Sequence, residues 1–230
     1  KYVIKNKHEK VILPYKNDKN NIVFSKLYYQ LSKTKEKIDN YSKKWDKAKK
    51  QANNYEYVYT SSNSSKNICK IHPVASRSYF KILEMVNEFE LNIDLKNIIC
   101  IAEGPGGFLQ YLSNRYVDKN LYGVTLISSN KEIPYWSPLL LSSNNIKLLY
   151  GIDGDGDLYK LNNIESISNE IDNCELITAD GGIDYSLNYN NQEILSYRLL
   201  YSEIITALKI QKEGGTFIIK FFDILHYNTC

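Results

Sequence analysis

Two lysines and one aspartate that lie far apart in the sequence could together perform proton transfer. Lys220 follows the apolar residues FII and precedes two phenylalanines, so its amine should be partly desolvated, and desolvation favours the neutral form. Asp180 ends the preceding predicted strand and would hold that amine, while Lys81 would add a like charge that favours loss of one proton. A neutral amine can act as a general base. The competing interpretation is an edge lysine whose ammonium group reaches solvent.

A glycine-rich segment, residues 98–110 (IICIAEGPGGFLQ), predicts a site for a bound cofactor. Its apolar run is typical of a buried parallel strand, and its glycines allow the backbone to pass close to a ligand before a helix begins near Phe108. Such a loop places backbone amides and the positive end of a helix beside a nucleotide. Leu109 stands where a dehydrogenase motif has its third glycine, and no acid follows the next strand, which disfavours a nicotinamide cofactor. A tight turn without a ligand is the alternative.

The elements that must position these residues alternate between strand and helix. Five short apolar runs predict strands at residues 97–102, 121–126, 146–150, 175–179 and 216–222. Helices are predicted at residues 108–115, 164–171 and 192–212, the last ended by two glycines at 214 and 215. The alternation predicts an α/β fold, a parallel sheet with helices on both faces. Because ligands bind outside the carboxyl ends of such strands, the glycine loop, Asp180 and Lys220 should meet at one edge.

A third strand end carries the segment GIDGDGD, residues 151–157. Its alternating aspartates resemble a calcium loop, but the twelfth position counted from Asp153 is Ile164, where an EF-hand needs glutamate. A carboxylate that hydrogen-bonds an adenine or a ribose fits a strand end better. A plain flexible turn is the other possibility.

The N-terminal part is basic and predicts a helical extension. Residues 1–50 hold 15 lysines and 5 acidic residues, a local charge of +10, which leaves −7 for the remainder because the whole chain carries +3. Residues 1–21 predict an extended arm, and apolar spacing from 23 to 53 predicts one long helix. The lysines favour a polyanion partner, although a solvated helix face would have the same composition.

A second helix is expected to begin at Ser76, whose hydroxyl can cap it, with Phe80, Leu83, Val86 and Phe89 buried. We predict two domains, an N-terminal arm and helix at residues 1–60 and an α/β domain at residues 61–230.

The composition limits the classes of protein to which the chain can belong. The chain has 230 residues, 43% of them hydrophobic, which is enough for a substantial core, and no apolar run long enough to cross a membrane. Neither a signal peptide nor a CxxC pair is present, so we expect an intracellular protein with reduced, buried cysteines. Met85 is the only methionine, so we expect Lys1 to open a fragment or a processed form.

Several segments, in order along the chain, resemble the motifs of the FtsJ-like ribose 2'-O-methyltransferases, and among them the eukaryal and viral enzymes that methylate the first transcribed nucleotide of capped mRNA. EGPGGF is similar to the family's AGPGGF cofactor loop, TADGG to its ADGG, and FIIKFFD to its lysine strand. GIDGDGD, NQEILSYRLL, SRSYFK and KKQANNYE resemble four further motifs, so the resemblance covers residues 49–230.

The resemblance implies a Rossmann-like sheet of the S-adenosylmethionine-dependent methyltransferases, with helices on both faces and a basic helical N-terminal extension. Lys81, Asp180 and Lys220 would be three members of the family's Lys-Asp-Lys-Glu tetrad, with Lys220 as the proton acceptor. The implied cofactor is S-adenosyl-L-methionine and the implied partner is capped mRNA, with neither metal nor membrane. The residues implied to hold the cofactor are Ser76, Ala102, Glu103, Gly104, Pro105, Gly106, Gly107, Phe108, Asp157 and Leu158; those implied to contact RNA are Lys49, Arg77 and Asn190.

The chain departs from the family pattern in two places. Glu103 replaces a small residue of the cofactor loop, and the sequence stops at Cys230, before the final strands and the glutamate that completes the tetrad. We therefore expect a C-terminally incomplete domain. The alternatives are an enzyme acting on ribosomal or transfer RNA and a catalytically silent RNA-binding subunit. We expect the protein in the nucleus if it is cellular, or in the host cytoplasm or virion if it comes from a large DNA virus.

Overall fold

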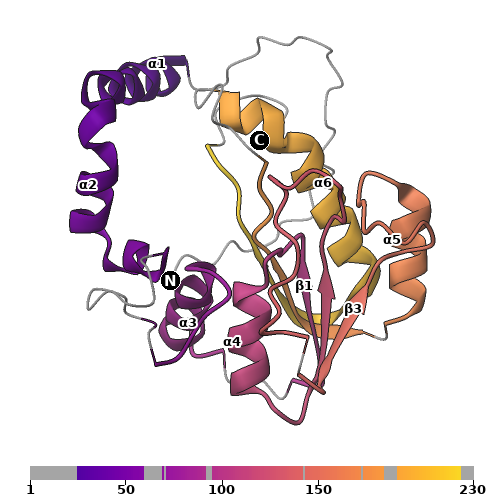
Figure 1. The fold of residues 1–230 in the computed structure, drawn as a ribbon. Coiled ribbons are helices and arrows are strands. Elements are labelled where there is room, and N and C mark those ends of the chain that lie inside the picture. Colours follow the sequence, from indigo (N-terminus) through magenta and orange to yellow (C-terminus); the bar gives the residue numbers. More distant parts are fainter. Residues whose placement is uncertain are drawn as a thin grey trace.

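A computed structural model describes residues 25–59, 69, 71–91, 95–141, 143–171, 173–183 and 191–223. Its centre is a five-stranded sheet in the order β3-β2-β1-β4-β5, and every neighbouring pair is parallel (Figure 1). The strands are β1 Asn97–Ile101, β2 Asn120–Val124, β3 Ile146–Leu149, β4 Cys174–Ala179 and β5 Gln211–Ile219. The predicted parallel α/β fold is confirmed.

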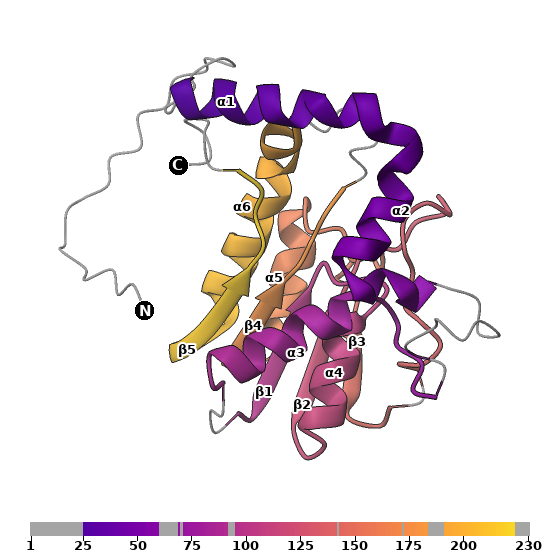
Figure 2. The same ribbon diagram turned by 90° about the vertical axis from the view of Figure 1, so that its left-hand side faces the viewer.

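Helices cover both faces of this sheet (Figures 1 and 2). One face carries α3 Ser78–Glu88 and α4 Gly107–Arg115, and the other carries α5 Leu161–Asn169 and α6 Gln192–Ile210. A hydrophobic core lies on each face of the sheet, and strand β1 contributes to both because its side chains alternate. Ile98 and Cys100 pack towards α3 and α4, whereas Ile99 and Ile101 pack towards α5 and α6. A strand buried on both faces reads as a continuous apolar run, as this one does.

The sheet reverses direction of growth between β1 and β4. From β1 the chain moves outward through β2 and β3, and then crosses back to add β4 and β5 on the other side. This switch point leaves a crevice outside the carboxyl ends of β1 and β4, where open α/β sheets bind their ligands. The fold thus places the glycine loop and Asp180, which follow these two strands, at one position.

The N-terminal extension is helical but is not the single helix that we predicted. It consists of α1 Ser25–Lys35, the 3-10 helix η1 Glu36–Tyr41, α2 Ser42–Ala52 and a second 3-10 helix, η2 Asn54–Tyr59. The η1 segment turns the chain between α1 and α2 (Figure 2). Lys35 at the end of α1 pairs with Asp223 just after β5, at 2.7 Å. The predicted arm at residues 1–21 lies outside the described residues.

Two further expectations were wrong, one of them in part. In the predicted stripe of α3, Val86 is buried and Leu83 packs against the core, but Phe89 is 64% exposed, and Ile82 is fully buried although we did not predict it. Gly214 and Gly215 do not end α6, which already ends at Ile210; they lie within β5, where the pairing with β4 shifts register. Gly214 has a φ of +76°, a conformation suited to such a bulge. No helix in the described part of the chain has both the length and the apolarity to cross a bilayer.

Candidate active site

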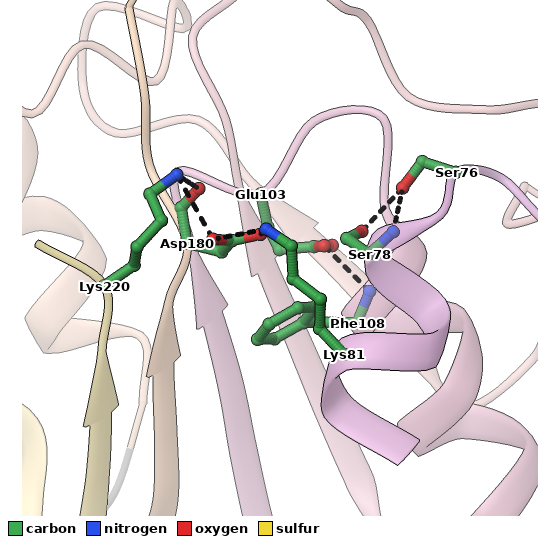
Figure 3. Close-up of polar contacts among 7 residues, drawn as sticks. All are labelled: Ser76, Ser78, Lys81, Glu103, Phe108, Asp180 and Lys220. Carbon is green, nitrogen blue, oxygen red and sulfur yellow. Dashed lines mark hydrogen bonds and ion pairs between the residues drawn. The ribbon is translucent and has the colours of Figure 1, made fainter. Parts of the chain in front are cut away.

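Three charged side chains from separate elements converge at the carboxyl edge of the sheet. Lys81 comes from the first turn of α3, Asp180 from the end of β4, and Lys220 from the end of β5 (Figure 3). The Nζ atom of Lys81 lies 2.9 Å from Oδ2 of Asp180 and 3.2 Å from its Oδ1. The Nζ atom of Lys220 lies 3.2 Å from Oδ1 of Asp180 and donates a hydrogen bond of 2.9 Å to its backbone carbonyl.

The two ammonium groups approach Asp180 from opposite sides, so both lysines point to one centre (Figure 3). The Asp180 side chain is only 11% exposed, whereas those of Lys81 and Lys220 are 42% and 32% exposed. One largely buried carboxylate therefore holds two amines that solvent and a substrate can still reach, and its single negative charge faces two positive ones.

A cavity of about 460 Å³ opens beside this cluster, and its size is that of a typical small-ligand pocket. Four of the residues implied to hold the cofactor line it, together with Asp180 of the charged cluster. Those four come from the glycine loop and from the loop after β3: Ala102, Gly104, Asp157 and Leu158. The structure thus brings both loops to one hollow at the switch point.

The cavity has a third wall that sequence reasoning missed. Thr125 and Leu126 directly follow β2, and they line the same hollow as Asn130, Glu132, Ile133 and Pro134. We considered only strand ends that carried charged or glycine residues, and the β2 end carries neither. The order of the strands was the available signal, since β2 lies next to β1 in the sheet and its carboxyl end must therefore border the same crevice.

The rest of the glycine loop has a packing role in the structure. A Cβ atom at Gly106 would overlap the side chain of Leu140, and one at Gly107 would overlap the hydroxyls of Ser76 and Ser78. Phe108 is 2% exposed and belongs to the core beneath α3 and α4. These residues let α4 begin close to the start of α3, and Pro105 lines a smaller hollow of about 160 Å³ with Lys81 and Asp180.

Glu103 occupies the helix end that we expected to face a cofactor. Its carboxylate accepts hydrogen bonds from the backbone amides of Phe108, at 2.8 Å, and Leu109, at 3.3 Å (Figure 3). It therefore satisfies two of the free amides at the start of α4. We expected the amides at this helix start to lie beside a nucleotide, but a side chain within the loop accepts hydrogen bonds from two of them. Glu103 also lines the smaller hollow, together with Lys81 and Asp180.

The position of Glu103 predicts how stability depends on pH. Burial raises its pKa to about 8, so the folded state holds a proton that the unfolded chain releases near pH 4.5. The contribution of Glu103 to the free energy of unfolding is therefore greatest below pH 4.5 and is lost as the pH rises towards 8. The free energy of unfolding falls over this range by at most about 1.4 kcal/mol per pH unit. We expect Glu103→Gln to flatten the fall of the unfolding free energy between pH 5 and 8, measured by urea denaturation. The exposed Glu213→Gln is the control, and an equal slope in both variants would contradict the prediction.

The aspartate loop after β3 is held by its own polar contacts. Lys160 pairs with Asp153 at 2.9 Å and with Asp155 at 2.6 Å, and Asn163 donates to Asp155 at 2.8 Å. The carboxylate of Asp157 accepts a hydrogen bond of 2.9 Å from the Tyr159 amide, and Asp157 lines the cavity. The loop is thus an ordered turn that presents one aspartate to the cavity. Among the described residues, no three His, Cys, Asp or Glu side chains are grouped so that they could hold a metal ion.

The structure describes two of the three residues expected to touch RNA, Arg77 and Lys49. Arg77 precedes α3 and pairs with Glu56, which is buried, so this arginine joins the extension to the α/β domain. Tyr55 strengthens the same junction by stacking on Phe80, with ring centroids 4.4 Å apart. Lys49 is half-buried near the end of α2, and Asn190 lies outside the described residues.

Ser76 lies beside the start of α3 and contributes to its capping. Its hydroxyl is 2.5 Å from that of Ser78 and accepts a hydrogen bond from the Ser78 amide at 3.2 Å, although the N-cap position itself is Arg77. Ser76 lines the smaller hollow with Lys81, so it is close to the charged cluster but outside the larger cavity.

Fold and site together define a doubly wound α/β protein with a small-molecule cavity at the switch point and a lysine-aspartate-lysine cluster beside it. The family model of the FtsJ-like methyltransferases matches residues 74–230, which is more than half of the chain. The chain belongs to this family, whose members use S-adenosylmethionine.

Individual relatives cover the same part of the chain. A cap-specific mRNA (nucleoside-2'-O-)-methyltransferase 1 of Trypanosoma brucei brucei is 36% identical over 132 residues, which are 54% of this chain and 35% of that protein. A cap-specific mRNA (nucleoside-2'-O-)-methyltransferase of Autographa californica nuclear polyhedrosis virus is 29% identical, over 66% of this chain and 58% of that protein. The chain thus spans about a third to three fifths of the length of these relatives. A crystal structure of a ribosomal RNA methyltransferase from Plasmodium falciparum is 19% identical with a TM-score of 0.46, over 63% of this chain and 76% of that one.

The residues of the cavity fit the family's cofactor. Gly104 and Gly156 both line the hollow, and in each case a Cβ atom would overlap a neighbouring backbone oxygen, so only glycine leaves the walls where they are. Leu158 and Ile133 offer apolar surface for a base, and Asp157 offers a carboxylate for hydroxyl or amino groups. The hollow borders Asp180, so a bound nucleoside would lie beside the lysine cluster.

Proposed function

We propose that this chain transfers a methyl group from S-adenosylmethionine to the ribose 2'-hydroxyl of the first transcribed nucleotide of capped mRNA. The observation that carries the proposal is the convergence of Lys81 and Lys220 on Asp180 at the rim of a cofactor-sized cavity. Ala102, Gly104, Asp157 and Leu158 would hold the cofactor, which supplies an electrophilic methyl group when bound. Neither a metal nor a membrane enters this proposal.

The chemical task of the lysine cluster is to remove one proton. An alcohol is a weak nucleophile until its proton leaves, and a positioned amine can take that proton as the oxygen attacks. We assign this role to Lys220, whose amine is held by both the side chain and the backbone carbonyl of Asp180. Lys81, on the opposite side of Asp180, would orient the same hydroxyl. Holding the hydroxyl between these groups in one orientation would supply the remaining part of the rate enhancement.

The choice of capped mRNA as the substrate rests on the relatives, two of which bear that specificity in their names at 36% and 29% identity. The basic extension is consistent with an RNA partner, since 15 lysines fall in residues 1–50. We expect the nucleus if the protein is cellular, and the host cytoplasm or the virion if it comes from a large DNA virus; the viral relative is consistent with the second expectation.

The test is methyl transfer from radiolabelled S-adenosylmethionine to short RNAs of one sequence, either capped or carrying a 5'-triphosphate. We expect transfer to the capped RNA, with the label on the 2'-oxygen of the first nucleotide after nuclease digestion. Equal transfer to both RNAs would favour a ribosomal or transfer RNA substrate. Cofactor-independent RNA binding without transfer would indicate a silent RNA-binding subunit and would overturn the proposed activity.

A further inference from the structure

A second buried acid lies next to the lysine cluster and has no part in the family tetrad as we assigned it. Glu203, in the middle of α6, is 1% exposed, and its Oε1 atom has no hydrogen-bond partner among the described residues. A buried carboxyl group with an unsatisfied oxygen is costly, so its retention suggests a role beyond packing. Sequence analysis gave no sign of it, because α6 was considered only as a supporting helix.

The backbone after Asp180 is shaped around this carboxyl group. A Cβ atom at Gly181 would overlap Oε1 of Glu203, so only glycine at this position lets the carboxyl approach the turn. Glu203 therefore packs against the backbone of the residue that immediately follows Asp180.

Glu203 also shares a small hollow with Lys220. The hollow is lined by Gly181, Ser196, Leu199, Leu200, Glu203, Lys220, Phe221 and Phe222. Among these residues only Glu203 and Lys220 carry a titratable group, and the Asp180 carboxylate is the other charge that acts on Glu203. Because Glu203 is buried, its charge would act on the partly exposed Lys220 with less screening than between two surface groups. Burial raises the pKa of Glu203 to about 8, so the acid holds its proton at neutral pH.

We propose that Glu203 is a positioning residue of the same active site, one that fixes the turn after Asp180 and controls how readily Lys220 exists as a neutral amine. While protonated, the carboxyl leaves Lys220 without a second negative neighbour, and the amine can accept a proton from a hydroxyl. Once ionised, the carboxylate stabilises the ammonium form of Lys220, and fewer molecules hold the base that methyl transfer needs. This inference rests on the proposed function, because it assigns Lys220 the role of proton acceptor.

The experiment compares Glu203→Gln and Glu203→Leu with the unchanged chain. Both variants remove the charge, but only glutamine keeps a polar side chain of similar shape against Gly181. We expect the midpoint of the rise of kcat with pH to fall by about 0.5 pH unit or more in both variants, because the competing carboxylate is gone. Glu165→Gln removes a carboxylate on α5 that lies 4.0 Å from Lys209, and it should leave the midpoint unchanged.

A second measurement does not depend on catalysis. Trace labelling of Lys220 with acetic anhydride between pH 6 and 11, quantified by mass spectrometry, reports the fraction of neutral amine directly. We expect its midpoint to fall in both Glu203 variants and to stay in place in Glu165→Gln. An unchanged labelling midpoint in the Glu203 variants would overturn the inference even if methyl transfer is observed. A shifted midpoint in a chain that methylates no RNA would support the inference about Glu203 and reject the proposed function.

Discussion

Replacing Lys220 with alanine should lower kcat for methyl transfer by about 10²- to 10⁴-fold, the range that a positioned general base contributes. Lys220→Arg should be as inactive as the alanine variant, because arginine keeps the positive charge but does not give up its proton in proteins. Lys220 does not line the larger cavity, so the affinity for S-adenosylmethionine, measured by calorimetry, should be retained in both variants. This pattern of lost turnover with intact cofactor binding separates a base from a structural lysine.

The matched control for Lys220 is Lys209→Ala. Lys209 lies on α6, its side chain is 39% exposed, and its nearest acidic partner is Glu165 at 4.0 Å. We expect normal turnover in this variant, because an exposed ion pair at that distance contributes little. Turnover that survives in Lys220→Ala would remove this lysine from the mechanism, and turnover that survives in Lys220→Arg alone would show that its charge matters rather than its proton.

Gly156→Ala should weaken cofactor binding more than tenfold, which corresponds to about 1.4 kcal/mol. Gly156 lines the cavity with a φ of +65°, and a Cβ atom there would overlap the backbone oxygen of Thr125 and lie 2.9 Å from its carbonyl carbon. The neighbouring Asp155 carbonyl accepts a hydrogen bond of 2.7 Å from the Ile127 amide, so the loop after β3 cannot move away without breaking its link to the loop after β2. Whether the Thr125 backbone shifts or the loop after β3 moves away, two walls of the cavity change.

Gly154 provides the control for this prediction within the same loop. Its φ of +74° is also in the left-handed region, but a Cβ atom there would meet no atom within 4 Å. Gly154→Ala should therefore lower the free energy of unfolding by about 1–2 kcal/mol, the conformational cost of a side chain at positive φ. It should bind the cofactor normally. Titration calorimetry and urea unfolding of both variants measure the two effects. Equal loss of cofactor affinity in Gly154→Ala would show that strain in the loop, and not the wall at Thr125, determines binding.

The sheet could be predicted from the sequence because its strands are buried on both faces. Such strands are continuous apolar runs, and β1 and β4 are fully buried along their whole length. Helix ends were harder to predict, since they depend on tertiary pairing. The two glycines at 214 and 215 are a typical signal for the end of a helix, yet here the strand pairing of β5 with β4 already begins at Gln211. The one-sided pattern of the extension likewise gave no sign of the break at η1.

The charged cluster could be predicted because strand order and chemical type both pointed to one edge, and Lys81, Asp180 and Lys220 do meet there. The position of the Glu103 side chain could not be predicted in the same way. Its side chain folds back on the amides of its own loop, a choice that depends on local backbone geometry rather than on residue spacing. Glu203 was missed for a related reason, since a polar residue in a long helix gives no indication of whether it faces solvent or a buried turn.

The irregular pairing of β5 divides that strand into a part that tolerates changes of length and a part that does not. Gln211 pairs with Cys174 and Thr216 pairs with Leu176, so four residues of β5 face a single residue of β4 in the interval between them. A deletion or insertion among homologues in that interval would be absorbed before the regular pairing resumes. One inserted residue between Thr216 and Ile219 would instead rotate the following side chain to the opposite face and turn Lys220 away from Asp180.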